Sequence, residues 1–522
     1  MFLSKWRPSS QGTLPGSPSR SWSVPLLIVV WLCLVAWRPA FFGFYHDDWS
    51  SVALPLERSG DLWPLVKADP GRPLYLVILY VLRPLLRDNV VLWQASLAMI
   101  HLMAAIALHR VASALCSDAP RGEGQVFGAT AGMLWLVFPW SLGYSAWTVM
   151  LPPNLGMLLA MGAIALVVGP EPSVRKTHVS LLLLVASWLI YEATWMIWLP
   201  FSLVLLARSF SRPDRQRRRL AWRFAIGSAS LQMLFVAWNR LSSAQLQAGK
   251  KLSANIISTF DSDRHLMLVQ LLPSLQWREC LTWAMWLVLA CLILNIRRWV
   301  FSPARVVVPL SLLLGLAISV IIYAAAGYAI EWVGLFSRVT LAISLWLSLL
   351  STAIFALAWH GAAKPIKAAL VLALAMVIAC LAHSLLVNSL PWKKSWDEQQ
   401  QILQALPQSV VDLADRDSLV LMDVPDGTPP VYTFRAFWDI SGAFALRMSH
   451  YVRGGPPHAF ATVARKGEWR TTWDGQTVRQ YWCNQSGAMV WALEASKFYL
   501  WTYPQAGVVA PTAPYDSGCV PR

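Results

Sequence analysis

Long apolar blocks set the strongest limit on what this chain can fold into. Runs of about 17–25 mainly apolar residues recur along residues 22–390, and about 20 such residues cross a bilayer as a helix. Of the 522 residues only 13% are charged, whereas a soluble domain carries about 25%. A membrane barrel shows short alternating segments instead. The sequence therefore predicts an all-α polytopic membrane domain.

The charge of the chain is unevenly distributed. The formal net charge is +16, from 43 basic and 27 acidic residues. Residues 391–522 contain 12 of each sign, so the whole basic excess lies in residues 1–390. An excess of Lys and Arg between apolar segments is typical of the cytoplasmic loops of membrane proteins. We therefore expect no nucleic-acid partner, because the positive charge belongs to the membrane domain.

Eleven apolar segments are long enough for us to expect membrane spans. They lie at about 22–44, 90–112, 127–146, 154–169, 178–191, 193–207, 221–240, 281–297, 306–327, 338–358 and 366–388. The apolar segment 74–86 is different, because 13 helical residues rise only about 20 Å and the hydrocarbon core is about 30 Å thick. We predict that 74–86 lies in the membrane interface.

The distribution of basic residues supports this count and sets the orientation. With the N-terminus in the cytoplasm, the expected cytoplasmic segments contain 19 Lys or Arg and four acidic residues. They include an arginine cluster within 208–223. If 74–86 crossed the membrane, this cluster would lie outside, against the positive-inside rule. We expect an integral protein of a bacterial inner (plasma) membrane, with a cytoplasmic N-terminus and an extracytoplasmic C-terminal region.

The predicted organisation has three parts. Residues 1–21 form a cytoplasmic tail, and residues 22–390 form the membrane domain with an extracytoplasmic loop at 45–89. Residues 391–522 form a small extracytoplasmic α/β domain, with an amphipathic helix at 396–414 and a buried strand at 417–425. Cys483 and Cys519 both lie in this domain, and the sequence leaves open whether they form a disulfide.

An acidic pair lies at the outer end of the first predicted span. The segment reads His46-Asp47-Asp48-Trp49, and Arg72-Pro73-Leu74 follows after one loop and opens the interfacial helix. Two adjacent carboxylates at a membrane interface are costly to desolvate, so they indicate a functional site. Taken alone, the pair is better explained as the solvated end of a span beside an anchoring Trp, and it is the context of the following loop and helix that favours a functional site.

Together with the topology, these motifs resemble the GT-C glycosyltransferases, which include protein mannosyltransferases, lipid A aminoarabinose transferases and O-antigen glucosyltransferases. The resemblance covers the topology of about 390 residues and, in motif, Asp47-Asp48 and Arg72-Pro73-Leu74. It implies transfer of a sugar from a polyprenyl-phosphate carrier to a glycan, lipid or protein acceptor, on the extracytoplasmic face and with inversion. It also implies that Asp47 is the catalytic carboxylate and Asp48 its acidic neighbour.

Elementary chemistry agrees with this resemblance. An inverting transfer needs a carboxylate that removes the proton of the acceptor as the acceptor attacks. The leaving group is a lipid phosphate, which is already a good anion and needs positive charge rather than a strong acid. Arg suits phosphate because its planar fork donates two hydrogen bonds. Two adjacent carboxyl groups can also couple and raise the pKa of one of them.

Three further residues are candidates for substrate binding beside Arg72. Arg338, at the outer entrance of a span, resembles the late-loop arginine that contacts carrier phosphate in the family, or it is a snorkelling anchor. Glu192 lies between two short spans and either lines the cavity or forms a solvated turn. His46 orients Asp47 or binds phosphate, unless it is only part of the span end.

No metal ligands are assigned from the sequence. Many members of the family carry a second acidic residue in the next outer loop, but residues 139–154 contain none. No other cluster has the spacing of a metal site, so the participation of a divalent cation stays open. The alternative functions are a flippase or transporter of lipid-linked glycans and a glycan polymerase. Transporters often show inverted repeats, which we do not find in this sequence.

Overall fold

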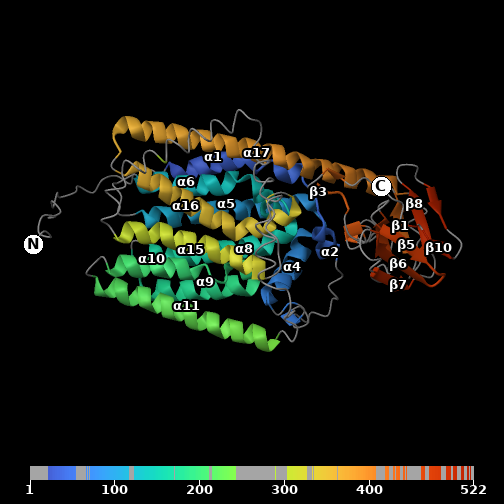
Figure 1. Ribbon diagram of the computed structural model, residues 1–522, viewed down its shortest axis with the longest axis horizontal. Coiled ribbons are helices and arrows are strands. Elements are labelled where there is room, and N and C mark those ends of the chain that lie inside the picture. Colours follow the sequence, from blue (N-terminus) through green and yellow to red (C-terminus); the bar gives the residue numbers. More distant parts are fainter. Residues whose placement is uncertain are drawn as a thin grey trace, which may run out of the picture.

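The computed structural model describes most of residues 22–406, with its main gaps at 54–65, 117–122, 211–213, 243–302 and 326–331. Beyond residue 406 it describes the strands, their immediate neighbours and parts of 431–443. The larger part of the described chain is a bundle of long helices that run side by side, and the strands gather at one end of this bundle (Figure 1). The chain therefore has a helical body and a smaller β-rich C-terminal region.

The helical body contains helices of very different lengths. In chain order they are α1 (Ser23–Leu34), η1 (Arg38–Ala40), α2 (Asp47–Ala53), α4 (Pro73–Leu86), α5 (Val90–Leu115), α6 (Glu123–Val137), η2 (Pro139–Ser141), α7 (Leu142–Ser145), η3 (Thr148–Met150), α8 (Leu151–Val168), α9 (Val174–Ile190), η4 (Glu192–Thr194), α10 (Trp198–Phe210), α11 (Arg215–Ser242), α15 (Pro303–Ala325), η5 (Leu335–Thr340), α16 (Leu341–Trp359) and α17 (Lys364–Ala405).

Seven helical segments of the described chain are long and apolar enough to cross a membrane. They are Ser23–Ala40, Val90–Leu115, Thr148–Val168, Glu192–Phe210, Arg215–Trp238, Ser337–Trp359 and Lys364–Ala405. An eighth is added if α6 and the following Pro139–Ser145, which bend by 55° at a break, form one span. An integral membrane protein is therefore confirmed in outline.

The predicted count of eleven spans is not confirmed. The predicted span 178–191 corresponds to α9, whose 17 residues are few for a 30 Å core, and the apolar part of α15 is also short, at Val307–Tyr323. The predicted span 281–297 lies outside the described residues. The bend after α6 follows from Pro139, because proline cannot continue the hydrogen-bond ladder of a helix.

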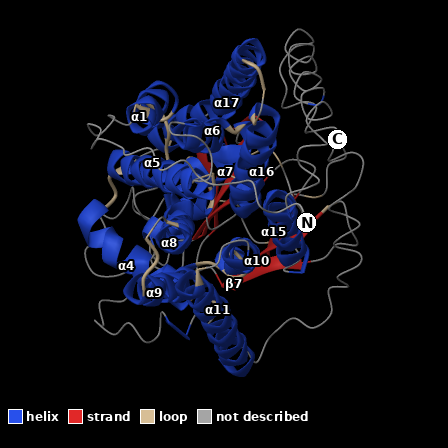
Figure 2. Ribbon diagram, turned by 90° about the vertical axis from the view of Figure 1, so that its left-hand side faces the viewer, coloured by secondary structure: helices blue, strands red, loops and turns tan. Residues whose placement is uncertain are grey.

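Helix α4 agrees with the segment predicted at 74–86. It has 14 residues, begins with Pro73 at its first position and is among the apolar helices too short to cross. In Figure 1 it runs steeply across the direction of the long helices, near the end of the bundle where α2 lies. Figure 2 shows α4 at the side of the bundle, next to α8 and α9.

Helix α17 joins the two parts of the molecule without a break. It has 42 residues and contains Pro391, so it passes through the boundary that the sequence predicted at 390/391. At 1.5 Å per residue it is about 63 Å long, twice the thickness of a hydrocarbon core. Part of α17 therefore extends beyond a hydrocarbon core, and the predicted helix at 396–414 is in its described part the end of α17.

The C-terminal region contains two four-stranded sheets and a short hairpin. In the first sheet, β1 (Ser418–Met422) pairs in parallel with β4 (Phe460–Ala464) and β8 (Phe498–Thr502), and β9 (Gly507–Val509) joins antiparallel. The second sheet is antiparallel, in the order β10 (Tyr515–Asp516), β5 (Trp469–Trp473), β6 (Thr477–Trp482) and β7 (Met489–Glu494). The hairpin is β2 (Gly427–Thr428) with β3 (Val431–Tyr432). The buried strand predicted at 417–425 is β1.

A close contact joins the C-terminal region to α2. A Cβ added to Gly442 would lie 2.5 Å from the carbonyl carbon of Trp49 and 2.7 Å from the nitrogen of Ser50. Trp49 also donates a hydrogen bond from Nε1 to Oε1 of Gln399 on α17, at 2.7 Å. The acidic helix α2 is thus enclosed by segments from the far end of the chain.

We predict that Gly442→Ala destabilises the fold by about 1–3 kcal/mol, because the new methyl group meets backbone that cannot rotate away. The matched control is Gly162→Ala in α8, where no atom lies within 4 Å of the added Cβ. This control should be neutral or stabilising by about 0.5–1 kcal/mol. Thermal unfolding in detergent measures both, and equal midpoints for the two variants would show that the contact at α2 is not tight.

Candidate functional site

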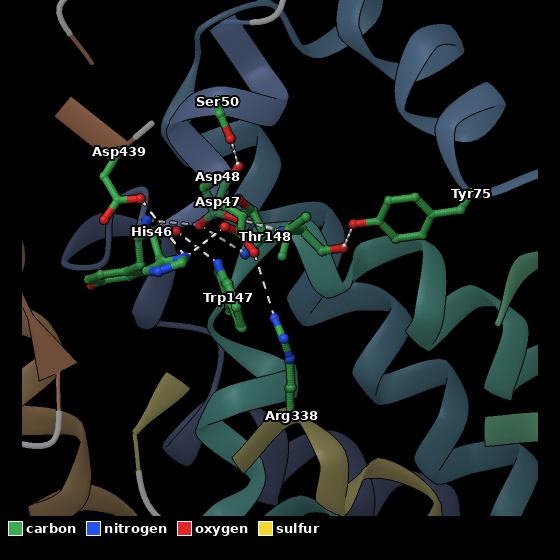
Figure 3. A network of polar contacts seen from close by, with 11 residues as sticks. His46, Asp47, Asp48, Ser50, Tyr75, Trp147, Thr148, Arg338 and Asp439 are labelled. Carbon is green, nitrogen blue, oxygen red and sulfur yellow. Dashed lines mark hydrogen bonds and ion pairs between the residues drawn. The ribbon is translucent and has the colours of Figure 1, made fainter. Parts of the chain in front are cut away.

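The acidic pair lies at the start of α2, which is close to the end of the bundle in Figure 1. Figure 3 shows the two aspartates with their neighbours. The first predicted span ends in η1, and the chain turns sharply at His46, whose φ is +45°. His is one of the few non-glycine residues enriched at positive φ. Asp47 and Asp48 then begin α2, where successive side chains point about 100° apart, so the two carboxylates meet different surroundings.

Asp48 is fully buried and belongs to the framework of the site. Its Oδ2 accepts hydrogen bonds from the backbone N–H groups of Tyr45 (2.9 Å) and Thr148 (3.2 Å). Its Oδ1 accepts one from the N–H of Val149. Burial raises the pKa of Asp48 to about 7, although these N–H donors act to lower it. Burial is thus the largest cause of the shift, whereas the sequence suggested coupling between neighbouring carboxyl groups.

Asp47 is the accessible member of the pair, with 34% of its side chain exposed. Its Oδ1 lies 2.7 Å from Nδ1 of His46, and its Oδ2 lies 3.6 Å from a guanidinium nitrogen of Arg338. The Arg338 guanidinium is also centred 4.7 Å from the ring of Trp147, which fixes its position by a cation–π contact. Tertiary folding therefore brings three of the predicted site residues, His46, Asp47 and Arg338, into one cluster.

Close backbone packing places Arg338 beside Asp47. Arg338 lies in η5, and a Cβ on Gly143 of α7 would be 2.5 Å from its backbone nitrogen. The N–H of Gly143 donates a hydrogen bond to Oγ of Ser337 at 3.1 Å. Only glycine allows this approach of α7 to η5. From sequence spacing alone Arg338 had no acidic partner, because Asp47 is almost 300 positions away.

His46 connects the acidic pair to the C-terminal region. Its Nδ1 lies 3.9 Å from Oδ1 of Asp439, and its ring packs edge-on against Trp147 at 5.9 Å. Burial of the ring acts to lower its pKa, but the hydrogen bond to Asp47 and the charges of Asp439 and Asp47 outweigh it. The pKa of His46 is therefore raised above its usual value of 6.5.

Asp439 is the residue of this cluster that sequence reasoning missed. It is 1% exposed and comes from the C-terminal region, where no local pattern distinguishes it from the other acidic residues. One ligand atom each from His46, Asp47 and Asp439 lie within 4.8 Å of one another. One nitrogen and two carboxylate oxygens are a donor set that a divalent cation accepts. This triad is where a cation would bind, if one takes part.

A second charged cluster lies on the other side of the acidic pair. Nε of Arg72 lies 3.0 Å from Oδ2 of Asp69 and 3.6 Å from Oε2 of Glu192. Asp69 is only three residues before Arg72 in the chain, whereas Glu192 comes from the turn between α9 and α10. The predicted residues Arg72 and Glu192 are therefore brought together, as an ion pair with each other.

Tyr75 links the two charged clusters. It follows Arg72 on α4, which places its ring 5.3 Å from the Arg72 guanidinium, and its hydroxyl donates to the carbonyl of Val149 at 3.1 Å. Val149 in turn binds Asp48. All six predicted site residues thus belong to one polar region at the end of the bundle, in which Asp47 is 34% exposed and lies beside the Arg338 guanidinium.

No protein-family model and no curated protein matches the chain. The function of this polar region must therefore be inferred from its geometry and chemistry. Asp47 can remove a proton, and Arg338 can bind an anion. The hydrogen bond between Asp47 and His46 also allows a proton to pass between these two side chains. A carboxylate beside a fixed cation suits a reaction that attacks a centre attached to phosphate.

The raised pKa of His46 makes a prediction about stability. A group whose pKa is higher in the folded state stabilises the fold fully below its unfolded pKa, near 6.5, and loses this effect as pH rises through the folded pKa. The unfolding midpoint of the wild type should therefore fall more steeply above about pH 6.5 than that of His46→Asn. Asn tolerates the positive φ and carries no charge.

The control for this measurement is His178→Asn, because His178 is exposed on α9. It should keep the steep pH dependence of the wild type. Comparison of variants also removes the separate contribution of Asp48, which all three proteins share. If His46→Asn follows the wild-type profile, protonated His46 does not stabilise the cluster.

Proposed function

We propose that this protein is an integral-membrane glycosyltransferase that moves a sugar from a polyprenyl-phosphate carrier to a glycan, lipid or protein acceptor, with inversion. The observation that carries the proposal is the position of Asp47, which is partly exposed and lies between His46 and Arg338 at the end of the bundle. The lipid tail of the donor stays in the bilayer, so the phosphate and the sugar attached to it lie at the membrane surface, where this end of the bundle is proposed to lie.

In the proposed reaction Asp47 is the general base. One of its oxygens takes the proton of the acceptor hydroxyl while the acceptor oxygen attacks the anomeric carbon. The bond between that carbon and the phosphate oxygen breaks on the opposite face, and the electron pair stays on the lipid phosphate. The attack and departure on opposite faces invert the anomeric centre.

The other residues of the site have different proposed roles. Arg338 holds the phosphate, which gains charge as the bond breaks. His46 orients Asp47, and Arg72 with Glu192 contributes to binding of the donor or the acceptor. Asp48 has no exposed surface, so its proposed contribution is to hold α2 against η3 rather than to touch substrate.

The proposed topology has eleven spans, the N-terminus in the cytoplasm and the acidic site with the C-terminal region outside a bacterial inner membrane. The positive-inside rule supports this orientation, because α11 begins with the arginine cluster at the end of the bundle opposite to the strands (Figure 1). Cys483 is disulfide-bonded, which suits an oxidising compartment. Cys519, its suggested partner, lies outside the described residues.

A flippase or a polymerase is the second candidate. Transporters bind their substrate near the middle of the membrane, between half-helices. The charged cluster of this chain lies instead next to α2 and α4, at the end of the bundle from which the strands extend (Figure 1). This position favours the transferase over the flippase.

Asp47→Asn tests the base directly. The amide keeps the shape of the side chain but cannot accept the proton, so transfer should fall by about 10²–10⁴-fold. The measurement is transfer of labelled sugar from polyprenyl phosphate in membranes with equal amounts of inserted protein. Asp88→Asn is the matched control, since Asp88 is exposed just after α4, and it should keep wild-type activity. Near-normal transfer by Asp47→Asn would refute the assignment.

Arg338 variants test the phosphate contact. Loss of one charge-assisted hydrogen bond costs about 1.5–3 kcal/mol, so Arg338→Ala should lower kcat/KM by roughly 10–150-fold. Arg338→Lys should recover only part of this, because it lacks the planar fork. The same changes at the exposed Arg87 should leave turnover unchanged. If Lys at 338 matches the wild type and Ala lowers only the membrane yield, Arg338 is an anchor.

A further inference from the structure

A second site lies at the opposite end of the bundle from the acidic cluster. A pocket lies between the end of α8, the start of α9, the end of α10 and the start of α11. Figure 2 views the bundle from the left-hand side of Figure 1, and there α8, α9, α10 and α11 lie next to one another.

Helix lengths place this pocket at the other surface of the membrane. Helix α8 begins at Leu151, next to the residues that bind Asp48, and ends at Val168, which lines the pocket. Its 18 residues rise about 27 Å, close to the thickness of the hydrocarbon core. The pocket therefore opens at the level of the lipid headgroups of the opposite leaflet.

The lining of the pocket is amphipathic. Val167, Leu205, Leu220 and Phe224 form apolar walls, and Thr177 and Ser209 add hydroxyl groups. The charged residues among those that line it are Arg208 and Arg217, both basic. An apolar wall below a basic rim matches a molecule that carries both an acyl chain and an anionic headgroup.

Arg208 and Arg217 are held at the rim by defined contacts. Two nitrogens of Arg208 donate to the carbonyl groups of Ala114 and Leu115 at the end of α5, and Nε of Arg217 lies 3.1 Å from Oδ2 of Asp214. The surrounding segment 208–223 contains seven arginines and one acidic residue. The local charge is therefore strongly positive even with Asp214 included.

We propose that this pocket binds an anionic phospholipid, with the phosphate of the headgroup at Arg208 and Arg217 and an acyl chain along the apolar wall. Basic pockets between membrane helices bind anionic headgroups in this way. The proposal does not depend on the glycosyltransferase assignment, because it uses residues at the other end of the bundle. A lipid bound here would tie α10 and α11 to α8 and α9.

The test uses the full-length protein in neutral detergent with soluble short-chain lipids. Dihexanoyl phosphatidylglycerol should raise the unfolding midpoint saturably, by mass action on the folded state. Dihexanoyl phosphatidylcholine and inorganic phosphate should each need at least about 10-fold higher concentration. Equal stabilisation by inorganic phosphate would overturn the lipid assignment, and equal stabilisation by phosphatidylcholine would overturn the role of the anionic headgroup.

Three variants separate the pocket from general surface charge. Arg217→Gln should weaken phosphatidylglycerol binding by about 10-fold or more, as loss of a charge-assisted contact does. Ala221→Leu keeps all charges but fills part of the pocket, and it should weaken binding by a similar factor. Arg219→Gln removes an exposed charge on the same helix that does not line the pocket, so its effect should stay below about 5-fold.

The outcomes are distinct. If Arg219→Gln weakens binding as much as Arg217→Gln, or if Ala221→Leu binds like the wild type, the lipid contacts the surface and not the pocket. Unfolding midpoints without added lipid show whether each variant folds. If Ala221→Leu does not fold, the comparison of Arg217→Gln with Arg219→Gln still decides.

Discussion

The buried carboxylate of Asp48 is the interaction on which the geometry of the acidic site depends. It accepts backbone N–H groups from its own turn, at Tyr45, and from η3, at Thr148 and Val149. Two segments about 100 residues apart are thereby held together at one side chain. An unpaired buried N–H is costly, so neither segment can move away without losing these bonds. These bonds hold Asp48 in the interior, and the neighbouring Asp47 on α2 is left partly exposed.

The division of work between the two aspartates could not be read from the sequence. Adjacent acidic residues look alike in a sequence. The apolar block and the first loop were sufficient to find the pair, but they do not show which aspartate is buried and which is exposed. The difference arises from tertiary contacts, because of these two successive residues of α2 it is Asp48 that faces the backbone of Thr148 and Val149. The short helix α4, in contrast, was predicted correctly, because the length of an apolar segment can be read from the local sequence.

Contacts between distant segments account for what the sequence could not predict. Asp439 contacts His46, Glu192 contacts Arg72, and Arg338 contacts Asp47, and each pair is separated by more than 100 positions. Helical spacing detects only partners three or four residues away. The span count shows a different limit: hydropathy marks apolar length, but it does not show that Pro139 ends α6 and that the chain bends there by 55°.

The C-terminal region is part of the site and not an independent attachment. Trp49 stacks on Trp396 of α17 at 5.9 Å and binds Gln399, while Gly442 lies against the backbone of α2. In the proposed transfer reaction, a wall on this side of α2 limits the directions from which an acceptor reaches Asp47. The open side is therefore set by helices of the bundle and by α17 together. Under the proposed function, the described residues of 431–443 and the end of α17 are therefore where acceptor specificity is expected to lie, whereas the contacts around Asp48 hold the framework.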